Sequence, residues 1–233
     1  MNVSQTKNPS MRKTWVVFFH ILLVSLSGCG RKPLEEAILG RWSETKEQRL
    51  YEFSSSGLYG VASNDEAVEI GEWSAKDGVV TMKSIVGPKE ARTETWKVTM
   101  SDESFDIAVN DAFYRRFEKS EDDSPPTDKR LVGLWRKDGK YANVFNFTDH
   151  GGVLGVMWRR EKDRSLVLMG LFGRVRGGTG EFTINGSMGT KTMLPVKHRY
   201  SMENDKLLWK GPKSEPEVFR RVQVQDLSFS LPK

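Results

Sequence analysis

The stretch Thr95-Trp96-Lys97-Val98-Thr99-Met100 alternates polar and apolar side chains and therefore predicts a β-strand. Successive side chains of a strand point to opposite faces of the sheet, so its three apolar residues share one face. Phe105, Ile107 and Val109 repeat the alternation shortly afterwards. Turn-forming sequences recur about every ten residues, at Ser55-Ser56-Gly57, Lys76-Asp77-Gly78, Ser101-Asp102-Glu103 and Glu203-Asn204-Asp205. This spacing predicts an all-β chain of short strands.

The pattern occurs twice, before and after an acidic segment with two prolines at residues 120–128. Matching stretches follow the same order in both copies, which predicts a tandem duplication. The matches are Leu39-Gly40-Arg41-Trp42 with Val132-Gly133-Leu134-Trp135, Phe53-x-x-x-Gly57 with Phe147-x-x-x-Gly151, Ile70-Gly71-Glu72-Trp73 with Met169-Gly170-Leu171-Phe172, Trp96-x-Val98-x-Met100 with His198-x-Tyr200-x-Met202, and Tyr114-Arg115-Arg116-Phe117 with Phe219-Arg220-Arg221-Val222.

Each copy has room for about eight short strands joined in order, without a helix long enough for a parallel crossover. The predicted fold is two small up-and-down antiparallel β-barrels in tandem, and the one helical signal, Pro33 to Leu39, leads into the first strand. The expected organisation is a signal peptide (1–28), a lipidated tether (29–32), a first β domain (33–119), an acidic linker (120–128), a second β domain (129–225) and a C-terminal tail (226–233).

The N-terminal segment combines three cations, an apolar run from Trp15 to Leu26 and small residues before Cys29, as secretory signal peptides do. Leu26-Ser27-Gly28-Cys29 resembles the bacterial lipobox, in which the cysteine is lipidated and becomes the N-terminus. That resemblance implies palmitate on Cys29 and a membrane anchor. The alternative is an ordinary signal peptide followed by an unpaired cysteine. Gly30, where lipoproteins of the inner membrane often have Asp, favours the outer membrane in a cell that has one.

Charge divides unevenly between the two copies. Residues 31–119 hold 13 basic and 17 acidic residues, residues 120–128 hold four acidic residues, and residues 129–233 hold 20 basic and 10 acidic residues. The high pI of 9.2 therefore belongs to the second copy. Such an excess predicts affinity for an anionic envelope surface. Neutralisation by the acidic first copy is the alternative, and nucleic acid does not fit the expected compartment.

A short helix, Gly-x-Trp on the first strand and a meander that ends in an arginine-bearing strand together resemble the lipocalin pattern. More closely, the chain is similar to the tandem lipocalin-like domains of bacterial lipoproteins. The resemblance implies that Trp42 and Trp135 close one end of each barrel, with Arg115 or Arg116 over Trp42 and Arg220 or Arg221 over Trp135. Alternation with the flanking apolar residues favours Arg115 and Arg220. Each copy is about half a lipocalin's length, so its aromatic side chains could fill the barrel.

The sequence shows no constellation of side chains that would carry catalysis, because its many carboxylates are scattered over strand faces and turns. Beyond the signal peptide the only histidines are His150 and His198, which is too few for a three-histidine metal site. His198 takes the place of Trp96 in the second copy and is expected to point inward, either as a packed histidine or as a polar contact in a small pocket. No metal, cofactor or catalytic residue is expected.

Three functions remain open from the sequence. The first is a non-enzymatic, lipid-anchored envelope protein that binds a ligand, such as a small hydrophobic molecule, or a partner. The second is a scaffold whose solid barrels act through their surfaces. The third is an envelope enzyme, which the sequence disfavours. An apolar cavity would favour the first function, and packed aromatic residues would favour the second.

Overall fold

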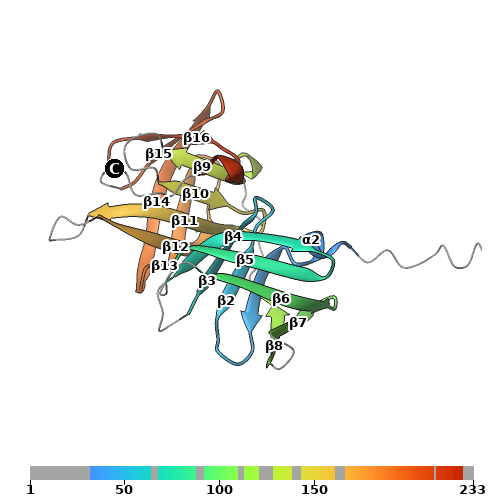
Figure 1. Ribbon diagram of the computed structural model, residues 1–233. Coiled ribbons are helices and arrows are strands. Elements are labelled where there is room, and N and C mark those ends of the chain that lie inside the picture. Colours follow the sequence, from blue (N-terminus) through green and yellow to red (C-terminus); the bar gives the residue numbers. More distant parts are fainter. Residues whose placement is uncertain are drawn as a thin grey trace, which may run out of the picture. The chain divides into compact units, whose positions relative to one another are not determined.

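Two closed eight-stranded antiparallel barrels follow one another along the chain (Figure 1). The computed structural model describes residues 32–63, 68–87, 92–109, 113–120, 128–137, 143–160, 166–212 and 214–227. In each barrel neighbouring strands follow chain order, and the last strand pairs with the first. The predicted all-β fold of two tandem up-and-down barrels is therefore confirmed.

Barrel 1 is the set of strands β1 to β8, and the helix α2 (Leu34–Ala37) precedes it. Its strands are β1 (Gly40–Glu44), β2 (Leu50–Phe53), β3 (Leu58–Ala62), β4 (Glu69–Lys76), β5 (Val79–Val86), β6 (Thr93–Met100), β7 (Ser104–Val109) and β8 (Phe113–Lys119).

Barrel 2 is the set β9 to β16, between the short 3₁₀ helices η1 (Lys129–Leu131) and η2 (Val224–Asp226). Its strands are β9 (Gly133–Lys137), β10 (Val144–Phe147), β11 (Gly152–Arg160), β12 (Leu166–Arg176), β13 (Glu181–Met188), β14 (Lys191–Glu203), β15 (Lys206–Lys210) and β16 (Glu217–Arg221).

Both barrels begin with the same local structure around Gly-x-Trp. The indole Nε1 of Trp42 donates to the carbonyl of Ile38 at 2.7 Å, and Trp135 does the same to Leu131 at 2.7 Å. The glycine two residues before each tryptophan has a positive φ, 115° at Gly40 and 128° at Gly133, a region that glycine reaches without steric cost. The turn before each barrel is thereby tied to the buried tryptophan of its first strand.

Strand register corrects two of the matches made from sequence. Trp73 N–H donates to the Gly57 carbonyl and Val175 N–H to the Gly151 carbonyl, so Val175 is the counterpart of Trp73. The match of Ile70–Trp73 with Met169–Phe172 is therefore wrong by three residues. Phe117 and Phe219 are likewise equivalent, because each pairs with the residue two places after the tryptophan of its barrel's Gly-x-Trp motif. The match of Tyr114–Phe117 with Phe219–Val222 is wrong by three residues as well.

Several expected segments lie outside the described residues: the expected signal peptide (1–28), Cys29, most of the expected linker (121–127) and the end of the expected tail (228–233). At the ends of the expected linker, Ser120 N–H donates to the Arg41 carbonyl of barrel 1, and buried Asp128 caps η1 of barrel 2. No helix in the described ranges has the length and apolar character needed to cross a membrane.

Candidate functional site

Aromatic side chains fill the inside of both barrels. In barrel 1 the rings of Phe105 and Phe117 stack at 4.4 Å, and Trp42 meets Phe105 edge-on at 4.8 Å. In barrel 2 Trp209 contacts the aromatic rings around it, at centroid distances of 4.6–5.8 Å: Phe145, Phe147, Phe182, His198 and Phe219. Ring pairs at these distances are favourable beyond their buried area. These interiors form packed hydrophobic cores.

An open hollow of about 330 Å³ lies beside α2 in barrel 1. Leu39, Trp73 and Ala75 give it an apolar lining, and Glu35, Ser55, Gly57 and Ser74 complete it. Its volume is at the lower end of the range for small-molecule pockets, about 300–1,000 Å³.

An arginine covers the ring of Trp135 in barrel 2, and this arginine is Arg221. Its guanidinium lies 4.4 Å from the Trp135 ring centroid and donates to the carbonyls of Val132 and Arg130 at 2.6 and 2.8 Å. Arg220, chosen from the sequence, is on the opposite face of β16, because the neighbouring Phe219 points into the core. The expectation of Arg220 over Trp135 is wrong.

In barrel 1 Arg115 shares a face of β8 with Phe117, and its Nε lies 3.4 Å from Glu44 Oε1. The register places Lys119, rather than Arg115, opposite Trp42. Glu44 is almost fully buried, and this burial raises the pKa of its carboxyl group, against the opposing effect of Arg115.

Barrel 2 holds the same pair with the charges exchanged. Lys137 is the counterpart of Glu44 and Glu217 is the counterpart of Arg115, and their Nζ and Oε1 atoms are 2.5 Å apart. An ion pair thus joins the first and last strands of each barrel at equivalent positions.

His198 is partly buried and packs against the core of barrel 2. Its ring stacks on Phe182 at 5.3 Å, and its Nδ1 accepts a hydrogen bond from Trp209 Nε1 at 2.8 Å. Burial lowers the pKa of His198, which favours the neutral ring that this bond needs. These contacts support the packing role.

A polar cluster that the sequence did not reveal joins the two barrels. Arg41 of β1 bonds Glu52 of β2 at 2.7 Å and donates to the Gly173 carbonyl of barrel 2 at 2.9 Å. Glu52 also accepts from Thr148 Oγ1 at 2.5 Å. Glu52 is 0% exposed and Arg41 is 4% exposed. These side chains point away from their own core, as alternation predicts, but the other barrel covers them.

An apolar cluster with members from both barrels surrounds these bonds. Leu58, Val68 and Ile70 of barrel 1 pack with Leu134, Val144, Leu154, Val156 and Phe172 of barrel 2. Gly60 permits this approach, since a Cβ there would meet Leu154 and Phe172 side chains. Val68 N–H also donates to the Gly189 carbonyl at 2.9 Å. The two barrels therefore share one continuous interface.

The described part of the chain contains no cluster of three or more metal-ligating side chains. No protein-family model matches the sequence, and comparison with curated proteins gives no match either. The resemblance to lipocalins therefore depends on the two Gly-x-Trp motifs, the leading helix and the two barrels.

Proposed function

We propose that the protein is a non-enzymatic, lipid-anchored lipoprotein of the cell envelope whose two lipocalin-like barrels act through their outer surfaces. The observation that carries this proposal is the aromatic packing inside both barrels, where a ligand-binding lipocalin would need space. Of the two non-enzymatic functions considered from the sequence, packed interiors support the scaffold with solid barrels.

The anchor in this proposal is palmitate on Cys29, supported by the lipobox-like Leu26-Ser27-Gly28-Cys29. Gly30 supports the outer membrane in a cell that has one. Two or three acyl chains would hold the protein at the membrane essentially permanently, since each buried methylene contributes about 0.8 kcal/mol.

The anchor is tested by growing cells with labelled palmitate and separating membranes from soluble protein. The wild type should carry the label and sediment with membranes, whereas Cys29→Ser should carry none and become soluble. Ser27→Ala, which keeps a small residue before the cysteine, is the matched control and should behave like the wild type. Membrane association of unlabelled Cys29→Ser would contradict the proposed anchor.

Binding of a small hydrophobic ligand is the second candidate, and the hollow beside α2 supports it. Native mass spectrometry of the protein purified from envelope extract distinguishes the two functions. A co-purifying small molecule that is lost from a Ser74→Trp variant would favour the ligand-binding function. The bare protein mass would favour surface action alone.

A further inference from the structure

The outer surface of barrel 2 carries cations that face one another across neighbouring strands. Lys206 of β15 is directly opposite Arg220 of β16, and Arg220 is directly opposite Arg136 of β9. On the adjoining pair of strands Arg199 is opposite Lys210. All five point outward, because their neighbours Leu207, Phe219, Trp135, Tyr200 and Trp209 belong to the core.

This arrangement is unfavourable for the isolated fold. Directly opposed side chains on an antiparallel pair lie about 4.5–5.5 Å apart at Cβ, and like charges there are destabilising. Among the described residues, two carboxylates offset part of the charge: Glu181 binds Lys197 and Arg199, which lowers its pKa, and Glu203 is opposite Lys206. We name the six cations Arg136, Lys197, Arg199, Lys206, Lys210 and Arg220 the basic face. They outnumber these two carboxylates three to one.

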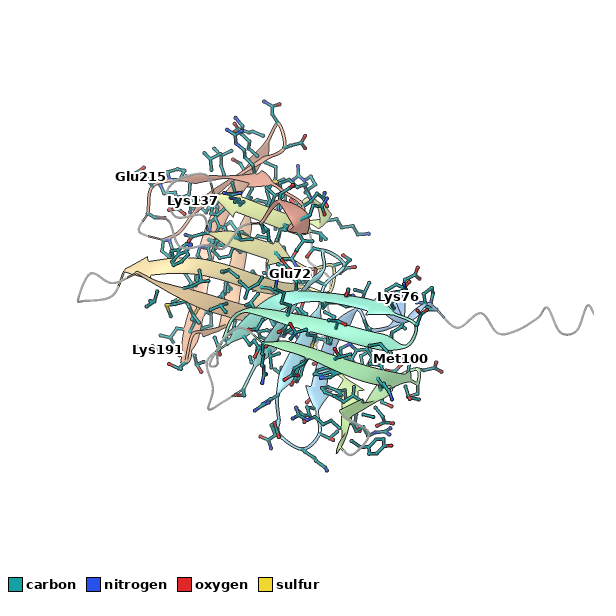
Figure 2. The ribbon with its side chains drawn as sticks, in the orientation of Figure 1. Glu72, Lys76, Met100, Lys137, Lys191 and Glu215 are labelled. Carbon is teal, nitrogen blue, oxygen red and sulfur yellow. The ribbon has the colours of Figure 1, made fainter. Side chains whose placement is uncertain are left out.

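Apolar side chains lie between the two rows of cations. Leu208 and Val218 are opposite each other on the outside of β15 and β16, and Val218 is 44% exposed. Figure 2 draws the side chains of barrel 2 on the ribbon, with Lys137 of β9 and Glu215 before β16 labelled. Cations that flank exposed Val218 and partly buried Leu208 match the head-group layer of an anionic membrane, where the charges meet phosphate and the apolar groups meet the acyl boundary.

We propose that the basic face binds anionic phospholipid head groups and lays barrel 2 against the membrane. The inference rests on the proposed function, because the anchor would hold the face near a bilayer. Its chemistry is charge complementarity spread over an open sheet surface.

Vesicle sedimentation tests this proposal with residues 32–233, which contain both barrels and lack Cys29. This two-barrel fragment should bind vesicles with about 30% phosphatidylglycerol in phosphatidylcholine but should not bind vesicles of pure phosphatidylcholine. Its binding should weaken at higher salt concentration, because salt screens the charges. Each cation near an anionic surface contributes about fivefold in affinity (~1 kcal/mol). Arg136→Gln/Lys206→Gln/Arg220→Gln should therefore bind on the order of 100-fold more weakly.

The matched control removes three exposed lysines from barrel 1, as Lys76→Gln/Lys83→Gln/Lys97→Gln, and should bind like the wild type. Thermal melting checks folding: the basic-face variant should melt at or above the wild-type temperature, because opposed like charges have been removed. A second basic-face variant, Lys206→Gln/Lys210→Gln, should bind on the order of 25-fold more weakly by the same estimate.

Equal loss of binding in both triple variants would overturn the assignment to this face, since net charge alone would then explain it. Binding to a soluble anionic polysaccharide but not to anionic vesicles would overturn the choice of lipid. The fragment 32–233 has no lipidation site, so its failure to bind vesicles would say nothing about the proposed anchor. The Cys29→Ser fractionation tests the anchor separately.

Discussion

Glu52 of barrel 1 accepts a hydrogen bond from Thr148 of barrel 2, and the repeat counterparts of these two residues form the neighbouring bond of the interface. Asn146 is the counterpart of Glu52 and Ser54 is the counterpart of Thr148, and Asn146 Nδ2 donates to Ser54 Oγ at 2.6 Å. The position of Glu52 and Asn146 in one copy thus contacts the position of Ser54 and Thr148 in the other copy, and this holds in both directions. This reciprocity is the pattern of an isologous two-fold interface, built here within one chain.

Removing only one member of the buried ion pair Arg41–Glu52 should strongly destabilise the protein. Arg41→Met leaves Glu52 without its cation in a fully buried site, and we expect a loss of about 3–5 kcal/mol in the free energy of unfolding. Arg41→Met/Glu52→Leu removes both charges and should recover most of this loss. Urea unfolding measures both variants. A loss below about 1 kcal/mol in Arg41→Met would contradict the role assigned to the pair.

Gly152 should be required for the barrels to approach each other. A Cβ at this position would collide with the carboxylate of Glu52, which the interface already holds on both oxygens. We expect Gly152→Ala to destabilise the protein by about 1–3 kcal/mol, as overpacking does. Gly178→Ala, where an added Cβ meets nothing within 4 Å, is the control. Thermal melts that are identical for both variants would argue against close contact at Gly152.

The ion pair of barrel 1 should tolerate the reversed charge order found in barrel 2. Glu44→Lys would place a cation beside Arg115, and Arg115→Glu would place a second carboxylate beside Glu44, so each single change should cost about 2 kcal/mol. The double variant reproduces the Lys137–Glu217 pair of barrel 2 and should unfold within about 1 kcal/mol of the wild type. The experiment is a double-mutant cycle by urea unfolding. Additive losses would show that the two positions do not interact.

Arg221 should stabilise barrel 2, and Arg220 should not. Arg221→Gln removes the contact with the Trp135 ring and disrupts the guanidinium bonds to two carbonyls, at a cost of about 1–2 kcal/mol. Arg220→Gln should be neutral or slightly stabilising, because it relieves repulsion from Lys206 and Arg136. Melting temperatures of the two variants give the answer. The reverse ranking would restore the assignment made from sequence.

Asp128 should make the free energy of unfolding of barrel 2 depend on pH in the acidic range. Hydrogen bonds from Arg130, and a further bond from Tyr200, hold the pKa of Asp128 at about 2, below its usual value of 3.8. A carboxyl whose pKa is lower in the folded state contributes stability above its unfolded pKa, so this contribution should fade from about pH 4 to pH 2. Asp128→Asn should lack this part of the pH dependence in urea unfolding. Asp102→Asn, at an exposed turn, should keep it.

Local pattern alone gave the strands, their order and the two Gly-x-Trp motifs. Alternation at Trp96, Val98 and Met100 depends only on the two-residue period of a strand, and the turn sequences set strand length. The duplication was also visible, because similar letters recur in the same order. What these signals share is that each is encoded within about ten neighbouring residues.

Strand register and the covering of outward faces were decided by the tertiary structure. Similar residues at Tyr114–Phe117 and Phe219–Val222 suggested a match, but the register differs by three residues. Arg220 was chosen because the apolar residues Val218 and Val222 flank it, yet Val218 is 44% exposed and Phe219 points into the core, so it is Arg221 that lies over Trp135. The side chains of Arg41 and Glu52 point away from the core of their own barrel and contact barrel 2. Only the second barrel, packed by contacts far apart in the sequence, turns those outward positions into a buried interface.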